Sequence, residues 1–269
     1  MDGLQAAVLG LIQGLTEFLP VSSSGHLVLA PWLFGWQDQS LAFDVAVHLG
    51  TLMAVVVYFW KDLLGLVPAV PRLIGPAQDA QVRLLRGLMI ATIPACVLGA
   101  VLQMLLDIEF GSPVLVAVNL MGFGLLLGAA DRWGRRDRQV ADLGWKGYLL
   151  LGCAQALALI PGTSRSGATM TAGLALGLDR VGAARVSFLM AVPVIAIAGA
   201  YEMLKLLRGD EVVDWAAMGI GVSVAFVSGW LCIAGLLKFL TRVGFWPFVA
   251  YRLLLGVVIL GLVGTGTIA

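Results

Sequence analysis

The chain has 269 residues, of which 60% are hydrophobic and only 12% are charged. Soluble domains carry about 25% charged residues, and a soluble protein of this size could not cover its surface with so few charges. The formal net charge of +1 provides no basic surface for a nucleic acid. The composition therefore excludes an ordinary soluble protein. It predicts an all-α polytopic membrane protein, because helices satisfy their own backbone hydrogen bonds in lipid.

Six stretches of the sequence are long and apolar enough to cross a bilayer as helices. A span needs about 20 mostly apolar residues, because the hydrocarbon core is ~30 Å thick and a helix rises ~1.5 Å per residue. The N-terminal segment MDGLQAAVLG has no cationic region before its apolar run, so we expect no cleaved signal peptide. The six expected transmembrane helices are residues 41–60, 87–106, 113–130, 184–206, 215–237 and 248–266.

Two further apolar regions, residues 3–36 and 145–178, are each interrupted by a polar segment. The interruptions read TEFLPVSSSGH and IPGTSRSGAT, and the apolar piece after each one is only about half as long as a span. Such breaks are tolerated at membrane depth only where protein or a water-filled cavity surrounds them. We therefore expect each region to form a re-entrant helical hairpin made of two broken helices.

The two interrupted regions match each other when one is shifted along the sequence by 142 residues. Each hairpin precedes three expected spans and returns to the side from which it entered, so the second hairpin must enter from the opposite face. The sequence therefore predicts one integral membrane domain, residues 1–269, built as an inverted-topology repeat of residues 1–140 and 141–269. The matching pairs are Gly10 and Gly152, Gln13 and Gln155, Leu15 and Leu157, Ser22 and Ser164, Ser24 and Ser166, and Gly25 and Gly167.

The distribution of positive charges agrees with this topology. In the predicted layout the 17 Lys and Arg residues lie on one side of the membrane, except Lys205 and Arg208 on the other side and Arg165 in the second break. If the second hairpin crossed the membrane, the later charges would change sides and the asymmetry would weaken. The positive-inside rule then places the charged side in the cytoplasm and both termini outside it, in the periplasm.

The first break combines a carboxylate, a proline, three serines and an imidazole. Gln13 and Glu17 are four residues apart and share one helix face, and an ionisable Glu17 in an apolar segment indicates function. Pro20 ends the first helix, and a serine can cap the second, whose N-terminus favours anions. Alternatively, the serines only cap and Glu17 only pairs with a neighbour. The polar residues after Pro20 are Ser22, Ser23, Ser24 and His26.

The second break offers another capped helix N-terminus and one arginine. Arg165 is the only cation outside the interfacial sets, and a guanidinium binds phosphate oxygens through two parallel hydrogen bonds. The inverted repeat brings this N-terminus toward the first, so that the two tips enclose a polar pocket. Arg165 could instead only pair with Glu17, and both interpretations can hold together. The candidate binding residues here are Ser164, Ser166, Gly167 and Thr169.

The expected pocket suits a phosphate or diphosphate group. Glu17, assisted by Gln13, could hold a divalent cation, Mg²⁺ or Ca²⁺, that shares the phosphate oxygens. The surroundings are apolar, so we expect the remainder of the ligand to be a lipid tail. Asp44 and His48 lie four residues apart on the first expected span. There, a structural hydrogen bond is favoured over a supporting role in the pocket.

The segment QGLTEFLPVSSSGHL, together with the later PGTSRSG, resembles the motifs of the bacterial undecaprenyl-diphosphate phosphatase family, also called the bacitracin-resistance protein family. The resemblance implies hydrolysis of undecaprenyl diphosphate to undecaprenyl phosphate and inorganic phosphate, which recycles the lipid carrier for peptidoglycan synthesis and confers resistance to bacitracin. It also implies a bacterial inner-membrane location, a site open to the periplasm, a divalent cation and a capacity to form homodimers. This chain has Gln13 where the family also uses Glu, so cation binding depends more heavily on Glu17.

The catalytic hypothesis assigns Arg165 to the transferring phosphoryl group, Glu17 to the cation or to an attacking water, and His26 to acid–base or nucleophilic catalysis. Ser23 is the rival nucleophile, and the sequence does not choose among water, His26 and Ser23. The rival function is a transporter or flippase for the polyprenyl-phosphate carrier that uses the same pocket, because inverted repeats with broken helices are also a transporter architecture. The substrate oxygens would contact Ser22, Ser24, Gly25, Ser164, Ser166, Gly167 and Thr169.

Overall fold

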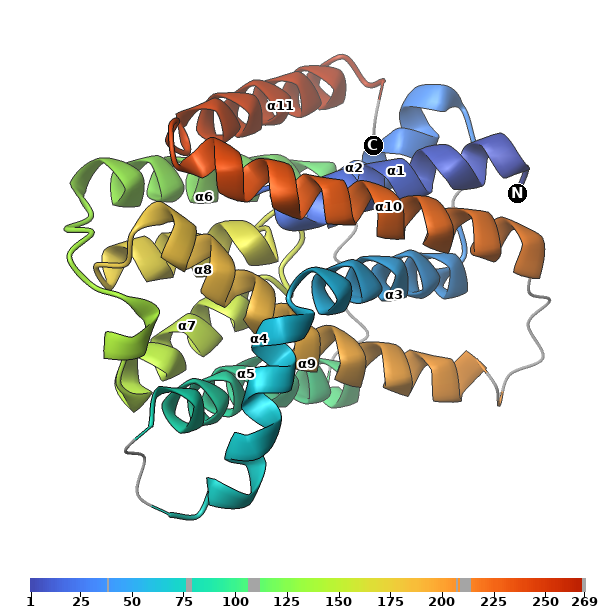
Figure 1. Cartoon of the computed structure of the whole chain (residues 1–269). Coiled ribbons are helices and arrows are strands. Elements are labelled where there is room, and N and C mark those ends of the chain that lie inside the picture. The colour runs from blue at the N-terminus through green and yellow to red at the C-terminus, as the bar shows by residue number, and fades with distance from the viewer. Residues whose placement is uncertain (38, 76–78, 106–111, 207, 209–213, 268–269) are drawn as a thin grey trace.

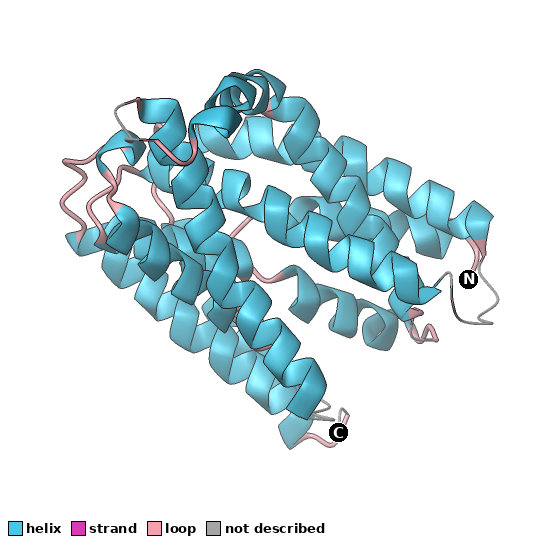
Figure 2. Cartoon of the chain, turned by 90° about the horizontal axis from the view of Figure 1, so that it is seen from below, coloured by secondary structure: helices cyan, strands magenta, loops and turns pink. Residues whose placement is uncertain are grey.

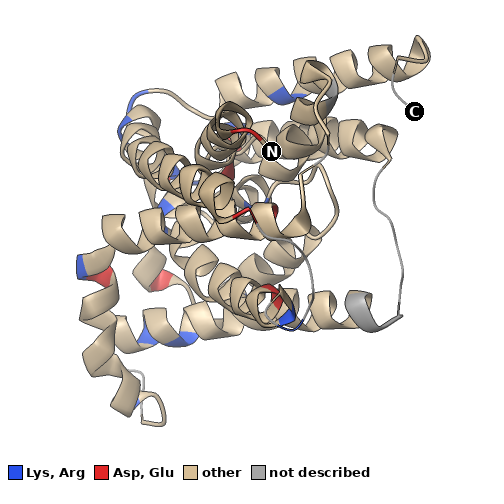
Figure 3. Cartoon of the chain, turned by 90° about the vertical axis from the view of Figure 1, so that its right-hand side faces the viewer, with Lys and Arg blue, Asp and Glu red and all other residues tan. Residues whose placement is uncertain are grey.

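The computed structural model describes residues 1–37, 39–75, 79–105, 112–206, 208 and 214–267, and these residues form a bundle of helices without strands (Figures 1 and 2). The all-α fold predicted from the composition is confirmed. Charged residues are sparse over the described ribbon (Figure 3). The elements are α1 (Gly3–Phe18), α2 (Ser23–Phe34), α3 (Leu41–Tyr58), α4 (Trp60–Leu66), η1 (Val67–Arg72), α5 (Ala80–Leu105), α6 (Pro113–Trp133), η2 (Val140–Asp142), α7 (Trp145–Leu157), α8 (Arg165–Ala175), α9 (Arg180–Leu206), α10 (Trp215–Leu240) and α11 (Trp246–Gly264).

Six of the described helices, α3, α5, α6, α9, α10 and α11, are long and apolar enough to cross a membrane. They correspond one for one to the six expected spans, which confirms a polytopic membrane protein. Two helices begin earlier than expected: α5 at Ala80 instead of residue 87, and α9 at Arg180 instead of residue 184. Each N-terminal extension carries arginine. The apolar stretch that defines a span in the sequence therefore begins later than the helix itself. The expected end of the second span, residue 106, lies outside the described residues.

Both interrupted regions form a pair of helices separated by a non-helical break. Helix α1 ends at Phe18 and α2 begins at Ser23, while α7 ends at Leu157 and α8 begins at Arg165. The second helix of each pair has 12 or 11 residues. At ~1.5 Å per residue, each is about half as long as the hydrocarbon core is thick. The broken helices therefore lie where the sequence predicts them, and their re-entrant course in a bilayer stays a prediction.

The two halves of the chain share a rare backbone conformation, and helices of each half pack against helices of the other. Ser22 and Ser164, which match in the expected repeat, have φ angles of 74° and 71°, a region that side-chain-bearing residues seldom adopt. Helix α1 packs against α10 of the other half, and α7 packs against α5 of the other half. Helices α6 and α11, the last spans of the two halves, also pack together (Figure 1). The two halves thus pack closely together, and the inverted repeat of residues 1–140 and 141–269 stays a prediction.

Glycines allow the first helix of each hairpin to approach its partner span closely. A Cβ atom on Gly10 would lie 2.5 Å from the Gly221 carbonyl oxygen, and one on Gly152 would lie 2.6 Å from the Ala91 carbonyl oxygen. Both distances are too short for any side chain, so these two matching positions require glycine. The first helix of each pair is therefore packed closely against a span of the opposite half.

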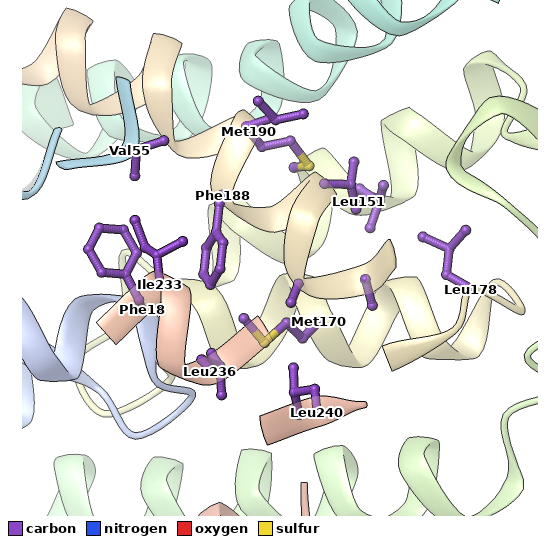
Figure 4. Close-up of a cluster of buried hydrophobic side chains, with 14 of the residues drawn as sticks. Phe18, Val55, Leu151, Met170, Leu178, Phe188, Met190, Ile233, Leu236 and Leu240 are labelled. Carbon is purple, nitrogen blue, oxygen red and sulfur yellow. The ribbon is translucent and has the colours of Figure 1, made fainter. Parts of the chain in front are cut away.

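A buried apolar cluster lies around the two breaks. Phe18 and Phe188 meet edge to face with ring centroids 5.3 Å apart, and Met170 and Ile233 join them from α8 and α10 (Figure 4). All four side chains are buried. This packing excludes solvent on one side of the breaks, which strengthens the electrostatic interactions of the polar groups next to it.

Candidate active site

Glu17, in the last turn of α1, is the centre of the polar cluster at the breaks. Its Oε1 atom accepts hydrogen bonds from Nη2 and Nε of Arg165 at 3.0 and 3.3 Å. Its Oε2 atom accepts from Ser23 Oγ at 2.7 Å and from Gln13 Nε2 at 3.2 Å. Only 6% of the Glu17 residue surface is exposed, so charge-assisted hydrogen bonds compensate a nearly buried carboxylate. The structure thus brings together Gln13, Glu17, Ser23 and Arg165.

The local sequence explains how these side chains converge. Gln13 and Glu17 share a face of α1, whereas Ser23 and Arg165 are the first residues of α2 and α8. Ser23 and Arg165 are also matching positions of the expected repeat. The first residue of each half-helix therefore forms a hydrogen bond with the same carboxylate. A further hydrogen bond, from Ser166 Oγ to the Leu19 carbonyl oxygen at 2.9 Å, joins the second half-helix to the first break.

The first serine of each motif caps its half-helix. Ser164 Oγ accepts from the Gly167 amide at 3.1 Å, and Ser22 Oγ lies 3.4 Å from the Gly25 amide. Ser24 Oγ is 3.3 Å from Ser22 Oγ and belongs to the same tip. Since the first amides of a helix have no intrahelical partner, both tips present N–H groups to an anion. A role for Ser22, Ser24 and Ser164 in substrate binding stays a prediction.

Two other predicted binding residues have structural partners in the interior. Thr169 Oγ1 donates to the Arg165 carbonyl oxygen at 2.7 Å and lies 2.6 Å from Ser187 Oγ on α9. A Cβ on Gly167 would lie 2.6 Å from Nη1 of Arg252, so this glycine makes room for a guanidinium. Thr169 therefore holds α8 against α9, and its predicted contact with substrate, like that of Gly167, is untested.

His26 lies on the first half-helix and has a partner on each ring nitrogen. Its Nδ1 atom is 2.7 Å from the Ser22 carbonyl oxygen, and its Nε2 atom is 2.6 Å from the Tyr251 hydroxyl. The rings of His26 and Tyr251 are stacked, 5.6 Å apart and inclined by 8°. Among the described contacts, the imidazole is thus held by Ser22 and Tyr251 rather than by Glu17 or Arg165.

The structure also reveals a functional candidate that the sequence reasoning placed wrongly. Arg252 was expected among the cytoplasmic interfacial charges, yet it is fully buried on α11. An arginine inside the expected span 248–266 was the signal that could have identified it. Its guanidinium reaches both breaks and α6. The acceptors are the carbonyl oxygens of Leu120 (2.9 Å), Pro20 (3.2 Å), Asn119 (3.3 Å), Gly162 (3.1 Å) and Thr163 (2.9 Å).

His48 is closer to the site than the sequence analysis favoured. Its Nε2 atom lies 3.7 Å from Glu17 Oε2, and its Nδ1 atom lies 2.7 Å from the Asp44 carbonyl oxygen. The structural hydrogen bond exists, but it involves the backbone of Asp44 and turns the other side of the ring toward the carboxylate. His48 is therefore a neighbour of the candidate site, the less favoured of the two interpretations.

The donor set fits a divalent cation only in part. Within the described residues there is no cluster of three His, Cys, Asp or Glu side chains. The Gln13 Oε1 atom is buried without a hydrogen-bond partner among the described residues, and such an oxygen suits Mg²⁺ or Ca²⁺. Both oxygens of Glu17 already accept hydrogen bonds. A cation would therefore depend on substrate phosphate oxygens in addition to Gln13 and Glu17.

Fold and site together define a polytopic α-helical membrane protein in which an arginine and a serine, from the N-termini of two half-helices, converge on one buried carboxylate. Residues 6–258 match the family described as "Bacitracin resistance protein BacA". The chain belongs to this family.

Similar proteins cover nearly the same length. The chain is 52% identical to "Undecaprenyl-diphosphatase 2" of Stutzerimonas stutzeri (strain A1501), with 97% of this chain and 98% of the relative aligned. It is 47% identical to "Undecaprenyl-diphosphatase 1" of Pseudoalteromonas translucida (strain TAC 125), with 96% and 97% aligned. It is 48% identical to the "Undecaprenyl-diphosphatase" of Nitrosococcus oceani, with 95% and 97% aligned.

Proposed function

We propose that this chain is an undecaprenyl-diphosphatase of the bacterial inner membrane. It hydrolyses undecaprenyl diphosphate to undecaprenyl phosphate and inorganic phosphate, which returns the lipid carrier to peptidoglycan synthesis and confers resistance to bacitracin. The observation that carries the proposal is the convergence of Arg165 and Ser23, from the tips of two half-helices, on the carboxylate of Glu17. Two proteins named undecaprenyl-diphosphatase, 52% and 47% identical to this chain over nearly its full length, support the proposal.

Arg165 binds the diphosphate and neutralises charge on the phosphoryl group that is transferred. A guanidinium forks onto two oxygens at once, and phosphoryl transfer depends mainly on positioning and charge stabilisation. Glu17 holds the guanidinium in place before the substrate arrives. The capped tips of α2 and α8 add backbone N–H groups. Arg252, buried against carbonyl oxygens rather than a carboxylate in its described contacts, contributes a second positive charge nearby.

Ser23 is the nucleophile that the geometry favours. Its hydroxyl donates to Glu17 Oε2 at 2.7 Å, so the carboxylate can take the proton while Ser23 Oγ bonds to the terminal phosphorus. The bond from that phosphorus to the bridging oxygen breaks, and undecaprenyl phosphate leaves. Water then attacks the phosphoserine, inorganic phosphate leaves, and the proton returns to Ser23. His26 is less suited to attack, because both ring nitrogens have partners.

The proposal includes a divalent cation, Mg²⁺ or Ca²⁺, held by Gln13 Oε1 and Glu17. When bound, it would neutralise further charge on the diphosphate. It also includes an active site that opens to the periplasm, periplasmic termini and a homodimer. Membrane-impermeant labelling of cysteines introduced at residues 2 and 265 would test the orientation, and chemical cross-linking in native membranes would test the dimer. Labelling of either position only in inverted vesicles would contradict the proposed topology.

Phosphate release from undecaprenyl diphosphate by the purified protein in detergent tests the function directly. We expect release that a chelator suppresses and that Arg165→Ala abolishes. Arg242→Ala, at an exposed arginine outside the site, is the matched control and should retain full activity. Absence of release by folded, cation-supplied protein would contradict the phosphatase proposal. Movement of labelled polyprenyl phosphate across vesicles under those conditions would favour the flippase alternative.

A further inference from the structure

We propose that Tyr251 is a positioning residue that acts through His26, a role that rests on the proposed phosphatase function. The two rings face each other across α2 and α11, with the Tyr251 hydroxyl 2.6 Å from His26 Nε2. This contact joins residues 225 positions apart, so it depends on the folded arrangement of the two halves.

The hydrogen bonds define the protonation pattern of the imidazole. The Ser22 carbonyl oxygen can only accept, so the nitrogen 2.7 Å from it, Nδ1, carries a hydrogen. In the neutral ring Nε2 then has a lone pair, and the Tyr251 hydroxyl donates to it. Parallel stacking at 5.6 Å restrains the plane of the ring as well. His26 is thereby fixed in one tautomer and one orientation.

Tyr251 itself is held in register with the active site by the residue that follows it. Arg252 donates to the carbonyl oxygens of Pro20 and Thr163, one from each break. Any displacement of α11 relative to the half-helix tips would break these hydrogen bonds and leave a buried charged donor unsatisfied, which is costly. Arg252 thus ties α11 to the break that carries Ser22, and Ser22 in turn holds His26. The distance between Tyr251 and His26 is therefore fixed from both residues.

This arrangement assigns His26 to the second step of the proposed reaction, where Nε2 takes the proton that the attacking water loses and gives it to the released inorganic phosphate. The imidazole is three residues from Ser23 on the same helix, so the two side chains lie on one face about one turn apart. The only lone pair of the neutral ring, on Nε2, faces the Tyr251 hydroxyl at 2.6 Å. Tyr251 therefore fixes the direction of this lone pair, and the ring is not free to form a bond to phosphorus.

A double-mutant cycle tests the proposal through activity. Tyr251→Phe keeps the ring and removes only the hydroxyl, and we expect kcat to fall about tenfold with a KM change below about twofold. His26→Gln should lower kcat by about 10²-fold, the scale of one acid–base group. The double variant should be no slower than His26→Gln, because Tyr251 acts only through the imidazole. Losses that multiply, or a normal kcat for Tyr251→Phe, would overturn the proposal.

A spectroscopic readout separates positioning from general loss of structure. The chain contains only two histidines, so ¹⁵N-histidine NMR of the full protein gives two imidazoles, which His48→Gln assigns. Tyr251→Phe should shift the His26 Nε2 resonance, whereas Tyr201→Phe, at a tyrosine on α9 with 51% exposure, should not and should keep full activity. An unchanged Nε2 resonance in Tyr251→Phe would contradict the proposal. Failure of wild-type protein to release phosphate would instead contradict the proposed function.

Discussion

Substituting Gly167 by alanine would test the geometry at the tip of the second half-helix. A Cβ atom there would lie 2.6 Å from Nη1 of Arg252 and 3.2 Å from the Ser164 side chain. Arg252 is fully buried and bound to carbonyl oxygens, so it has little freedom to move. Overpacking of this kind costs ~1–3 kcal/mol, and alanine recovers at most ~1 kcal/mol of helix propensity relative to glycine. We therefore expect a net loss of ~1–2 kcal/mol in the free energy of unfolding.

The matching glycine of the other half provides the control. A Cβ on Gly25 would meet nothing closer than 3.4 Å, the distance to Val116 Cγ1. Gly25→Ala should leave the free energy of unfolding unchanged or raise it by up to ~1 kcal/mol. Denaturant titration of both variants in the same detergent would measure the difference. If Gly167→Ala proved as stable as Gly25→Ala, Arg252 would not occupy the position that underlies the described site.

Three further predictions concern the proposed chemistry. Arg165→Lys should lower kcat by at least about 10²-fold, because an ammonium cannot fork onto two phosphate oxygens; steady-state phosphate release measures this, with Arg242→Lys as the control. Ser23→Ala should abolish trapping of labelled phosphate on the protein at early times, and a phosphoenzyme in this variant would exclude Ser23 as the nucleophile. Gln13→Glu places a second carboxylate beside Glu17 and should lower the cation concentration needed for half-maximal activity, measured by titration after chelation; an unchanged requirement would remove Gln13 from the cation site.

The spans and breaks were accessible to sequence reasoning because each has a local cause. Long apolar runs set the six spans, and Pro20 with the serines that follow it sets the first break. The pairing of Glu17 with Arg165 was also foreseeable, because the two are rare charges in the interrupted regions of a repeat. The sequence left open whether Arg165 only pairs with Glu17 or also binds phosphate. The structure shows the pair, and binding of phosphate stays a prediction.

The partners of His26 and Arg252 could not be inferred in this way. The Tyr251 hydroxyl meets His26 only because α11 lies beside the first break, a packing relation with no local pattern in the sequence. Arg252 lies four residues inside an expected span, where an interfacial arginine and a buried one look alike. Its burial depends on five carbonyl oxygens of the two breaks and α6 that accept its hydrogen bonds. These oxygens come together only when the two halves pack.

The distribution of the active-site groups over both halves has a consequence for biogenesis. Glu17 is synthesised 148 residues ahead of its guanidinium partner, so in the early chain its described partners are Gln13, Ser23 and His48 alone. A carboxylate without its guanidinium partner is costly inside a bilayer, so in the predicted topology we expect the N-terminal half alone to be less stable in the membrane than the whole chain. Completion of the proposed catalytic centre is therefore a late event of synthesis, because Glu17 gains its ion pair only after Arg165 has been made.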